Sequence, residues 1–160
     1  MTLRVLIAIL TACVAASCAS KPPPMAPPPP PPKATLVLQT RPDVNPDTSG
    51  RASPVVVRVY QLRTDSAFTG AGFSNLFDDE RKALGADLIA RDEYELIPGE
   101  RRTLELAPPA DMRFLGALAA FHDVRNSNWR ALLAVPKNGL GNGRIEVVAD
   151  KTNIRIELGH

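Results

Sequence analysis

Cysteine and histidine are scarce in this chain, and their scarcity removes most routes to catalysis. The two cysteines are Cys13 and Cys18, and the two histidines are His122 and His160. His122 is followed by Asp123, but neighbouring residues on a strand point to opposite faces. Sequence adjacency therefore does not supply the hydrogen-bond reach that a catalytic base and its orienting carboxylate need. We expect no enzymatic activity.

Motifs for metals, nucleotides and sugars are also missing. The acidic runs 78–80 and 92–93 lack the alternating oxygen ligands and the following glycine of a calcium loop. The glycine-rich residues 139–143 lack the Lys-Ser/Thr pair of a phosphate-binding loop, so we expect no cofactor. Aromatic residues make up 5% of the chain, and we interpret the single tryptophan, Trp129, as a core or sheet-edge anchor rather than a sugar platform. A net charge of +2 gives no reason to expect nucleic acid as a partner.

The N-terminus has the features of a lipoprotein signal. Arg4 precedes an apolar run, residues 5–16, which is shorter than the roughly 20 residues of a membrane-spanning helix and suits a signal-peptide core. A buried helix or a retained short anchor is the alternative. Small residues precede Cys18, so we predict a signal peptide over residues 1–17 and a lipid on Cys18, with Cys13 as the competing site. The lipid is the only non-protein group expected. Alanine rather than aspartate after the lipidated cysteine predicts the outer membrane.

A proline-rich segment follows the cysteine. Residues 22–32 are nearly all proline, and such a run adopts a polyproline II helix that rises about 3.1 Å per residue, or about 34 Å in total. We predict that residues 18–33 are a lipidated tether that holds a domain away from the membrane. A ligand for a proline-binding groove is the alternative interpretation.

Residues 34–160 have the length of one domain with its own core, and most of it has the pattern of short strands. Alternating apolar and polar residues, or clustered β-branched residues, predict strands at residues 35–39, 54–62, 102–106, 144–147 and 153–158. The last two strands flank residues 149–152 and predict a hairpin. A period of two with one polar face indicates antiparallel sheets packed on one side. We therefore predict an all-β fold, a two-sheet antiparallel sandwich of seven or eight strands.

Two segments leave alternatives open. The almost wholly apolar residues 114–121 fit either a helix or a central strand, and Gly116 favours the strand. Between residues 64 and 80, Phe73, Leu76 and Phe77 have helical spacing. They predict one or two helical turns that seal one edge of the sandwich, with a binding groove as the alternative.

The segment 41–53 is long for a connection between neighbouring strands. It contains two prolines, a glycine and several side chains that can hydrogen-bond to the local backbone. A structured, protruding loop is a natural element for recognising a partner. A tolerated surface insertion is the alternative.

With these features in place, the chain resembles the TssJ family, the outer-membrane lipoproteins of type VI secretion systems. The resemblance covers about residues 36–135 and is carried by the following segments: Asn45-Pro46-Asp47 with Gly50, the run 53–62, Phe68, Phe73 and Leu76, residues 84–88, Pro98-Gly99-Glu100, residues 114–121 and Trp129-Arg130. The run 53–62 and the stretch from Phe114 to Arg130 are its most specific parts. The proline tether is longer and purer than the family leads us to expect.

The resemblance implies a transthyretin-like sandwich with a small helical element and no enzymatic activity. It implies that the protein sits on the inner leaflet of the outer membrane and binds the periplasmic C-terminal region of the inner-membrane protein TssM, with TssL joined indirectly through the same complex. It also makes the first loop a contact for TssM, here the residues Pro42, Asp43, Val44, Asn45, Pro46, Asp47, Thr48, Ser49, Gly50 and Arg51. Among these we expect Asn45, Asp47 and Arg51 as polar contacts and Val44 as an apolar one.

A periplasmic module that binds peptidoglycan or another glycan is the alternative function. Such a module would carry exposed aromatic platforms, whereas the few aromatic residues here mostly occupy core-like positions in the sequence. An enzyme that uses His122 and Asp123 is the third possibility and the least supported by the sequence.

Overall fold

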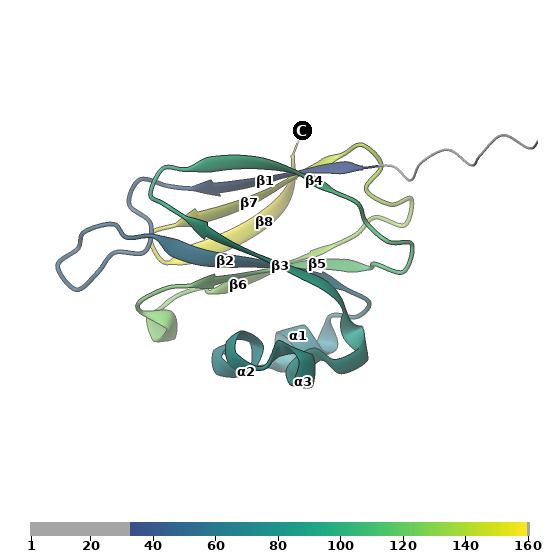
Figure 1. Ribbon diagram of the computed structural model, residues 1–160, viewed down its shortest axis with the longest axis horizontal. Coiled ribbons are helices and arrows are strands. Elements are labelled where there is room, and N and C mark those ends of the chain that lie inside the picture. Colours follow the sequence, from purple (N-terminus) through teal and green to yellow (C-terminus); the bar gives the residue numbers. More distant parts are fainter. Residues whose placement is uncertain (1–32, 160) are drawn as a thin grey trace, which may run out of the picture.

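The computed structural model describes residues 33–159 and shows a β-sandwich with a helical layer on one face (Figure 1). Its elements in chain order are β1 (Ala34–Thr40), β2 (Val55–Leu62), α1 (Ser66–Gly70), α2 (Phe73–Asp78), α3 (Glu80–Leu84), η1 (Gly85–Asp87), β3 (Leu88–Leu96), β4 (Arg101–Leu106), β5 (Phe114–Ala120), η2 (Val124–Asn126), β6 (Arg130–Ala134), β7 (Arg144–Asp150) and β8 (Asn153–Gly159). The all-β, two-sheet prediction is confirmed. The predicted signal peptide, the lipidated cysteine and residues 18–32 of the tether lie outside the described residues.

The strands form two sheets of four. One sheet has the order β4-β1-β7-β8 and the other β3-β2-β5-β6. The predicted hairpin around residues 149–152 is present as β7 and β8. One pairing differs from the expected antiparallel arrangement, because β1 and β7 run parallel. These two strands are far apart in the chain, so no tight turn forces them to be antiparallel.

The core lies between the inner faces of the two sheets. Alternate residues of facing strands fill it, among them Leu36 and Leu38 of β1 and Val57 and Val59 of β2, all at most 3% exposed. Every second residue of these strands faces this core, as the period of two of a strand requires. The run 54–62 predicted a strand because β-branched residues cluster in it.

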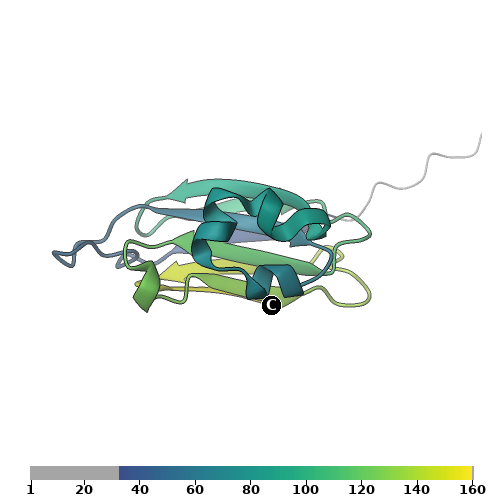
Figure 2. The ribbon, with the colours of Figure 1, turned by 90° about the horizontal axis from the view of Figure 1, so that it is seen from below.

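The helices cover the outer face of the second sheet, as the view in Figure 2 shows. Phe68 of α1 and Leu76 of α2 are buried against Tyr60 of β2 and Leu118 of β5. The expectation of a flap that seals one edge of the sandwich is therefore corrected, because the helices lie over a sheet face and not along an edge. With both faces covered, β5 is buried on both sides, which explains why its sequence is apolar without alternation.

Gly116 has a packing reason to be glycine. A Cβ atom at this position would lie 2.9 Å from Cζ of Phe68, closer than real contacts allow. The absence of a side chain lets the tip of the Phe68 ring approach the strand, where the ring packs against Tyr60 with centroids 5.3 Å apart. The strand favoured for residues 114–121 is confirmed, and its glycine admits the aromatic ring of the helical layer.

An arginine connects the helical layer to the sheet electrostatically. Arg58 of β2 is only 8% exposed. Its Nε donates to Glu93 of β3 at 2.6 Å, and its Nη1 donates to the carbonyl of Phe77 at 2.7 Å and lies 3.3 Å from Glu80. The guanidinium also lies over the Phe77 ring at 4.1 Å. Burial lowers the pKa of Arg58, but the hydrogen bonds and charges of Glu93 and Tyr60 together outweigh burial, so the net pKa lies above its ordinary value.

Candidate partner-binding surface

The connections of the sandwich divide between its two ends. The connections β1–β2, β3–β4, β5–β6 and β7–β8 lie at one end, and Lys33 enters at the other, beside the connections β4–β5 and β6–β7 (Figure 1). The β1–β2 loop projects beyond the sandwich in both ribbon views (Figures 1 and 2). We call its end the loop end and the opposite one the tether end. The described chain therefore begins at the end of the domain opposite the loop.

The base of the β1–β2 loop is fixed by two buried residues. Val44 is 0% exposed and belongs to the core, and Asn45 is 3% exposed. The Asn45 amide donates from Nδ2 to the carbonyl of Pro54 at 2.6 Å, and its Oδ1 accepts from the backbone N–H of His122 at 2.7 Å. The backbone N–H of Asn45 also donates to the carbonyl of Lys151 at 2.8 Å. Asn45 thereby joins three connections at the loop end.

This position of Val44 and Asn45 corrects the expectation that they offer contacts to a partner. The side chain of Val44 faces the core, and that of Asn45 is occupied by partners inside the protein. Asn45 has a φ of 50°, in the left-handed region that asparagine tolerates better than most residues. Their role in this structure is to hold the loop in place.

The tip of the loop is a tight turn organised by Asp47. Its Oδ1 accepts from the N–H of Ser49 at 2.9 Å, from the Ser49 hydroxyl at 2.6 Å and from the N–H of Arg51 at 3.0 Å. The Ser49 hydroxyl, followed by the Arg51 N–H, lowers the pKa of Asp47 from 3.8 to about 2. The turn closes with a hydrogen bond from the N–H of Gly50, at a φ of 81°, to the carbonyl of Asp47. The Asp47 carboxylate therefore stabilises the conformation of the loop.

The remaining predicted loop residues lie at the surface. The exposed ones are Pro42, Asp43, Thr48, Ser49, Gly50 and Arg51, while Pro46 and Asp47 are half-buried. Of the residues singled out as polar contacts, Arg51 is the most exposed: its side chain is 83% exposed and donates from Nε to the Asp47 carboxylate at 3.3 Å. The exposed part of the loop is therefore polar and carries no large apolar side chain.

The β3–β4 turn lies next to the loop and is attached to β1. Thr40, the last residue of β1, is buried, and its hydroxyl donates to the carbonyl of Ile97 at 2.6 Å and accepts from the N–H of Glu100 at 2.9 Å. The N–H of Ile97 and then Arg102 hold the pKa of Glu100 below its ordinary value. The pair Pro98-Gly99 is typical of a turn, but nothing in the sequence indicates the attachment of this turn to β1.

The other residues considered for chemistry do not form a reactive site. His122 and Asp123 are both exposed, and the Asp123 carboxylate accepts from the N–H and the side-chain amide of Asn126. Among residues 33–159, no group of histidine, cysteine, aspartate and glutamate could hold a metal ion. Trp129 is half-buried and meets the Phe73 ring edge-on at 5.4 Å. This contact agrees with a structural anchor rather than a sugar platform.

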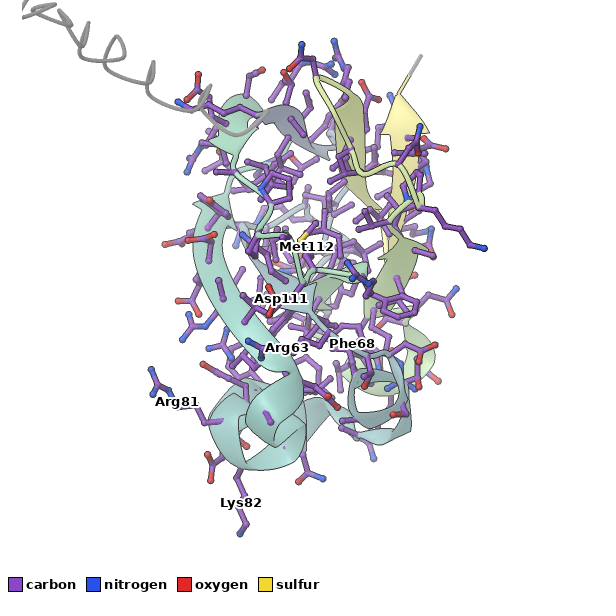
Figure 3. All side chains as sticks on the ribbon, turned by 90° about the vertical axis from the view of Figure 1, so that its right-hand side faces the viewer. Arg63, Phe68, Arg81, Lys82, Asp111 and Met112 are labelled. Atoms are coloured by element: carbon purple, nitrogen blue, oxygen red, sulfur yellow. The ribbon has the colours of Figure 1, made fainter. Side chains whose placement is uncertain are left out.

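The tether end shows an ion pair at the surface and a buried methionine, and no group of side chains that could hold a metal ion is found there among the described residues. Figure 3 looks onto this end, where Arg63 and Asp111 form an ion pair at 2.8 Å. Met112 is buried between the sheets, and Arg81 and Lys82 of α3 point to solvent. In the described part of the chain, no helix combines the length and the apolar character that crossing a membrane requires.

The family model and the similar solved structures agree on one protein family. Residues 32–160 match the family described as type VI secretion lipoprotein, VasD, EvfM, TssJ. The T6SS lipoprotein TssJ1 from Pseudomonas aeruginosa is 34% identical, with a TM-score of 0.76 over 82% of this chain and 98% of that one. Serratia marcescens Lip, a membrane-bound component of the type VI secretion system, is 26% identical, with a TM-score of 0.72 over 79% and 98%.

A further similar chain occurs in the structure of the T6SS protein TssM C-terminal domain from EAEC. It is 26% identical, with a TM-score of 0.60, and the match covers 81% of this chain and 98% of that one. No curated protein matches the chain. All three solved chains are covered almost completely, so the likeness extends over the whole domain and not over a shared fragment.

Proposed function

Because this chain belongs to the TssJ family of type VI secretion lipoproteins, we propose that it tethers the inner-membrane protein TssM to the outer membrane. The lipid on Cys18 holds the chain in the inner leaflet of the outer membrane, and the sandwich binds the periplasmic C-terminal region of TssM. TssL joins indirectly, through TssM, in the same trans-envelope complex. The role is mechanical: one protein links two membranes, and no reaction is catalysed.

The observation that carries this proposal is that the described chain begins at the end of the sandwich opposite the β1–β2 loop. The tether enters at Lys33, and the rigid β1–β2 loop projects from the far end (Figure 1). A domain held by lipid at one end presents its other end away from the membrane, toward a protein that reaches across the periplasm. The occurrence of a similar chain in a TssM C-terminal domain structure supports TssM as the partner.

The glycan-binding alternative gains no support from the described surface. The exposed large hydrophobic residues among those described are Ile97 and Leu158, and neither is aromatic. Sugar rings stack on exposed aromatic faces, and Phe73, Phe77 and Trp129 instead pack against one another. We therefore retain a protein as the partner.

The anchoring part of the proposal is tested by membrane fractionation. A soluble periplasmic fragment of TssM, from the same genome, is produced in cells with this chain or with its Cys13→Ser, Cys18→Ser double variant. We expect the fragment in the outer-membrane fraction with the unmodified chain and in the soluble fraction with the double variant, because two or three acyl chains are needed for durable anchoring. Palmitate labelling of the single variants identifies the lipidated cysteine.

Two results of this experiment would contradict the proposal separately. A TssM fragment that stays soluble beside a membrane-bound chain would refute the tethering. A double variant that still incorporates palmitate, or that still resides in the outer membrane, would refute the lipid anchor.

A further inference from the structure

We propose that Ile97, in the β3–β4 turn, is the apolar anchor of the partner-binding surface and enters an apolar pocket of the partner. This inference rests on the proposed function and adds a second contact to the same surface. The β1–β2 loop offers a partner no large apolar side chain. The one large apolar residue between Arg41 and Ser53, Val44, is buried in the core of the protein itself.

A polar loop alone makes a poor interface. Stable protein interfaces have an apolar, desolvated centre surrounded by a polar rim, and a few well-packed side chains supply most of the binding energy. The exposed loop residues Thr48, Ser49 and Arg51 can form such a rim but not its centre. The apolar centre must therefore come from another element at the same end.

The β3–β4 turn supplies this apolar centre through Ile97, which is apolar and exposed. Its side chain is 59% exposed, and among the described residues Leu158, at 41%, is the other large hydrophobic residue at the surface. Leu158 lies in β8 and pairs with Ile145, near the start of β7, so it belongs to the tether end. A single exposed apolar residue needs no explanation by itself. The argument for Ile97 depends on how it is held and on what lies beside it.

The turn holds Ile97 rigidly. The N–H of Glu100 donates to the carbonyl of Ile97 at 3.1 Å, Pro98 and Gly99 occupy the central positions, and Gly99 has a φ of 78°, which are the features of a type II turn. The N–H of Ile97 donates to the Glu100 carboxylate at 2.9 Å. Both backbone groups of Ile97 are thus engaged, so a partner that buries its side chain orders little additional backbone.

The turn is also attached directly to the loop. Thr40 binds both Ile97 and Glu100 through its hydroxyl, and the next residue, Arg41, begins the loop and donates from its N–H to the carbonyl of Ala149 at 2.8 Å. The loop and the turn therefore form one rigid surface that a single partner can cover. The partner it fits is a protein with an apolar pocket next to groups that bind the polar loop tip, which is the TssM region under the proposed function.

Calorimetric titration with the TssM periplasmic region tests this inference, using the full chain purified in detergent. Burying an isoleucine side chain is worth roughly a ten- to hundredfold gain in affinity, so we expect Ile97→Ser to raise the Kd by that factor. Ile97→Val removes one methylene and should raise it about fourfold. The matched control is Leu158→Ser, which removes an exposed apolar side chain at the tether end and should leave the Kd within about twofold of the unmodified chain.

The outcomes separate this inference from the proposed function. The comparison variant is a loop exchange in which residues 47–51 become glycine and serine. If the loop exchange abolishes binding while Ile97→Ser binds like the unmodified chain, the anchor role of Ile97 is refuted and the function stands. If the unmodified chain does not bind TssM at all, the proposed function fails and this inference fails with it.

Discussion

Replacement of Asn45 by alanine is expected to lower the free energy of unfolding by about 2–4 kcal/mol, a large effect for one residue of a loop. The side chain makes two hydrogen bonds, to the carbonyl of Pro54 and from the N–H of His122. The loss of each part-buried hydrogen bond costs roughly 0.5–1.5 kcal/mol net. Alanine at a φ of 50° adds about 1 kcal/mol of backbone strain. Chemical denaturation followed by circular dichroism measures the total.

The same substitution is expected to weaken TssM binding, although the Asn45 side chain does not face the partner. Without its hydrogen bonds the loop is no longer held to the connections that contain His122 and Lys151. Asn45→Gly is the matched control, because glycine accepts the positive φ but lacks the amide. We expect Asn45→Gly to be more stable than Asn45→Ala by only about 1 kcal/mol, the backbone strain that glycine avoids. Stability equal to that of the unmodified chain in both variants would show that Asn45 does not hold the loop.

Replacement of Arg58 by methionine is expected to cost about 3–5 kcal/mol of stability, because it removes one partner from a buried ionic cluster. Glu93 and the carbonyl of Phe77 lose the donor that they share, and the Phe77 ring loses the cation above it. Glu80 and Glu93 both keep Arg91, at 3.0 Å and 3.2 Å. The helical layer should therefore detach from the sheet before the sandwich unfolds.

Trp129 provides the readout for this detachment. It is the single tryptophan of the chain and packs edge-on against Phe73 of α2. In Arg58→Met we expect its fluorescence to change at lower urea concentration than the circular dichroism of the strands. The matched control is Arg58→Lys, which keeps the charge but not the fork that binds a carboxylate and a carbonyl together, so an intermediate loss is expected. A single transition at the position of the unmodified chain in Arg58→Met would contradict the role of Arg58.

The strands that the sequence predicted are those whose burial differs between their two faces or is complete on both. The clustered β-branched residues of β2, which is buried along almost its whole length, and the apolar run of β5 were both interpretable for this reason. The sequence did not predict β3, because as an edge strand with charged residues at 91–93 it lacks a continuous apolar face. The short β6 of residues 130–134 is half-buried over most of its length and was missed as well.

The position of the loop could be predicted, whereas the direction of its side chains could not. Prolines, Gly50 and the polar residues between 41 and 53 marked an ordered loop, which the structure contains. The inward direction of Asn45 depends on His122, which is 77 positions away in the sequence. The attachment of the turn at Ile97 depends likewise on Thr40, at a separation of 57 positions. Such long-range hydrogen bonds leave no local pattern to read.

The most direct test of the binding role is the titration of the TssM periplasmic region into the loop-exchanged chain. Replacing residues 47–51 leaves Val44 and Asn45 in place, so the base of the loop and the core are retained. We predict saturable binding to the unmodified chain and none to the loop-exchanged chain at tens of micromolar, with the same circular dichroism spectrum for both. Equal affinity of the two chains for TssM would contradict the assignment of the loop end as the binding surface.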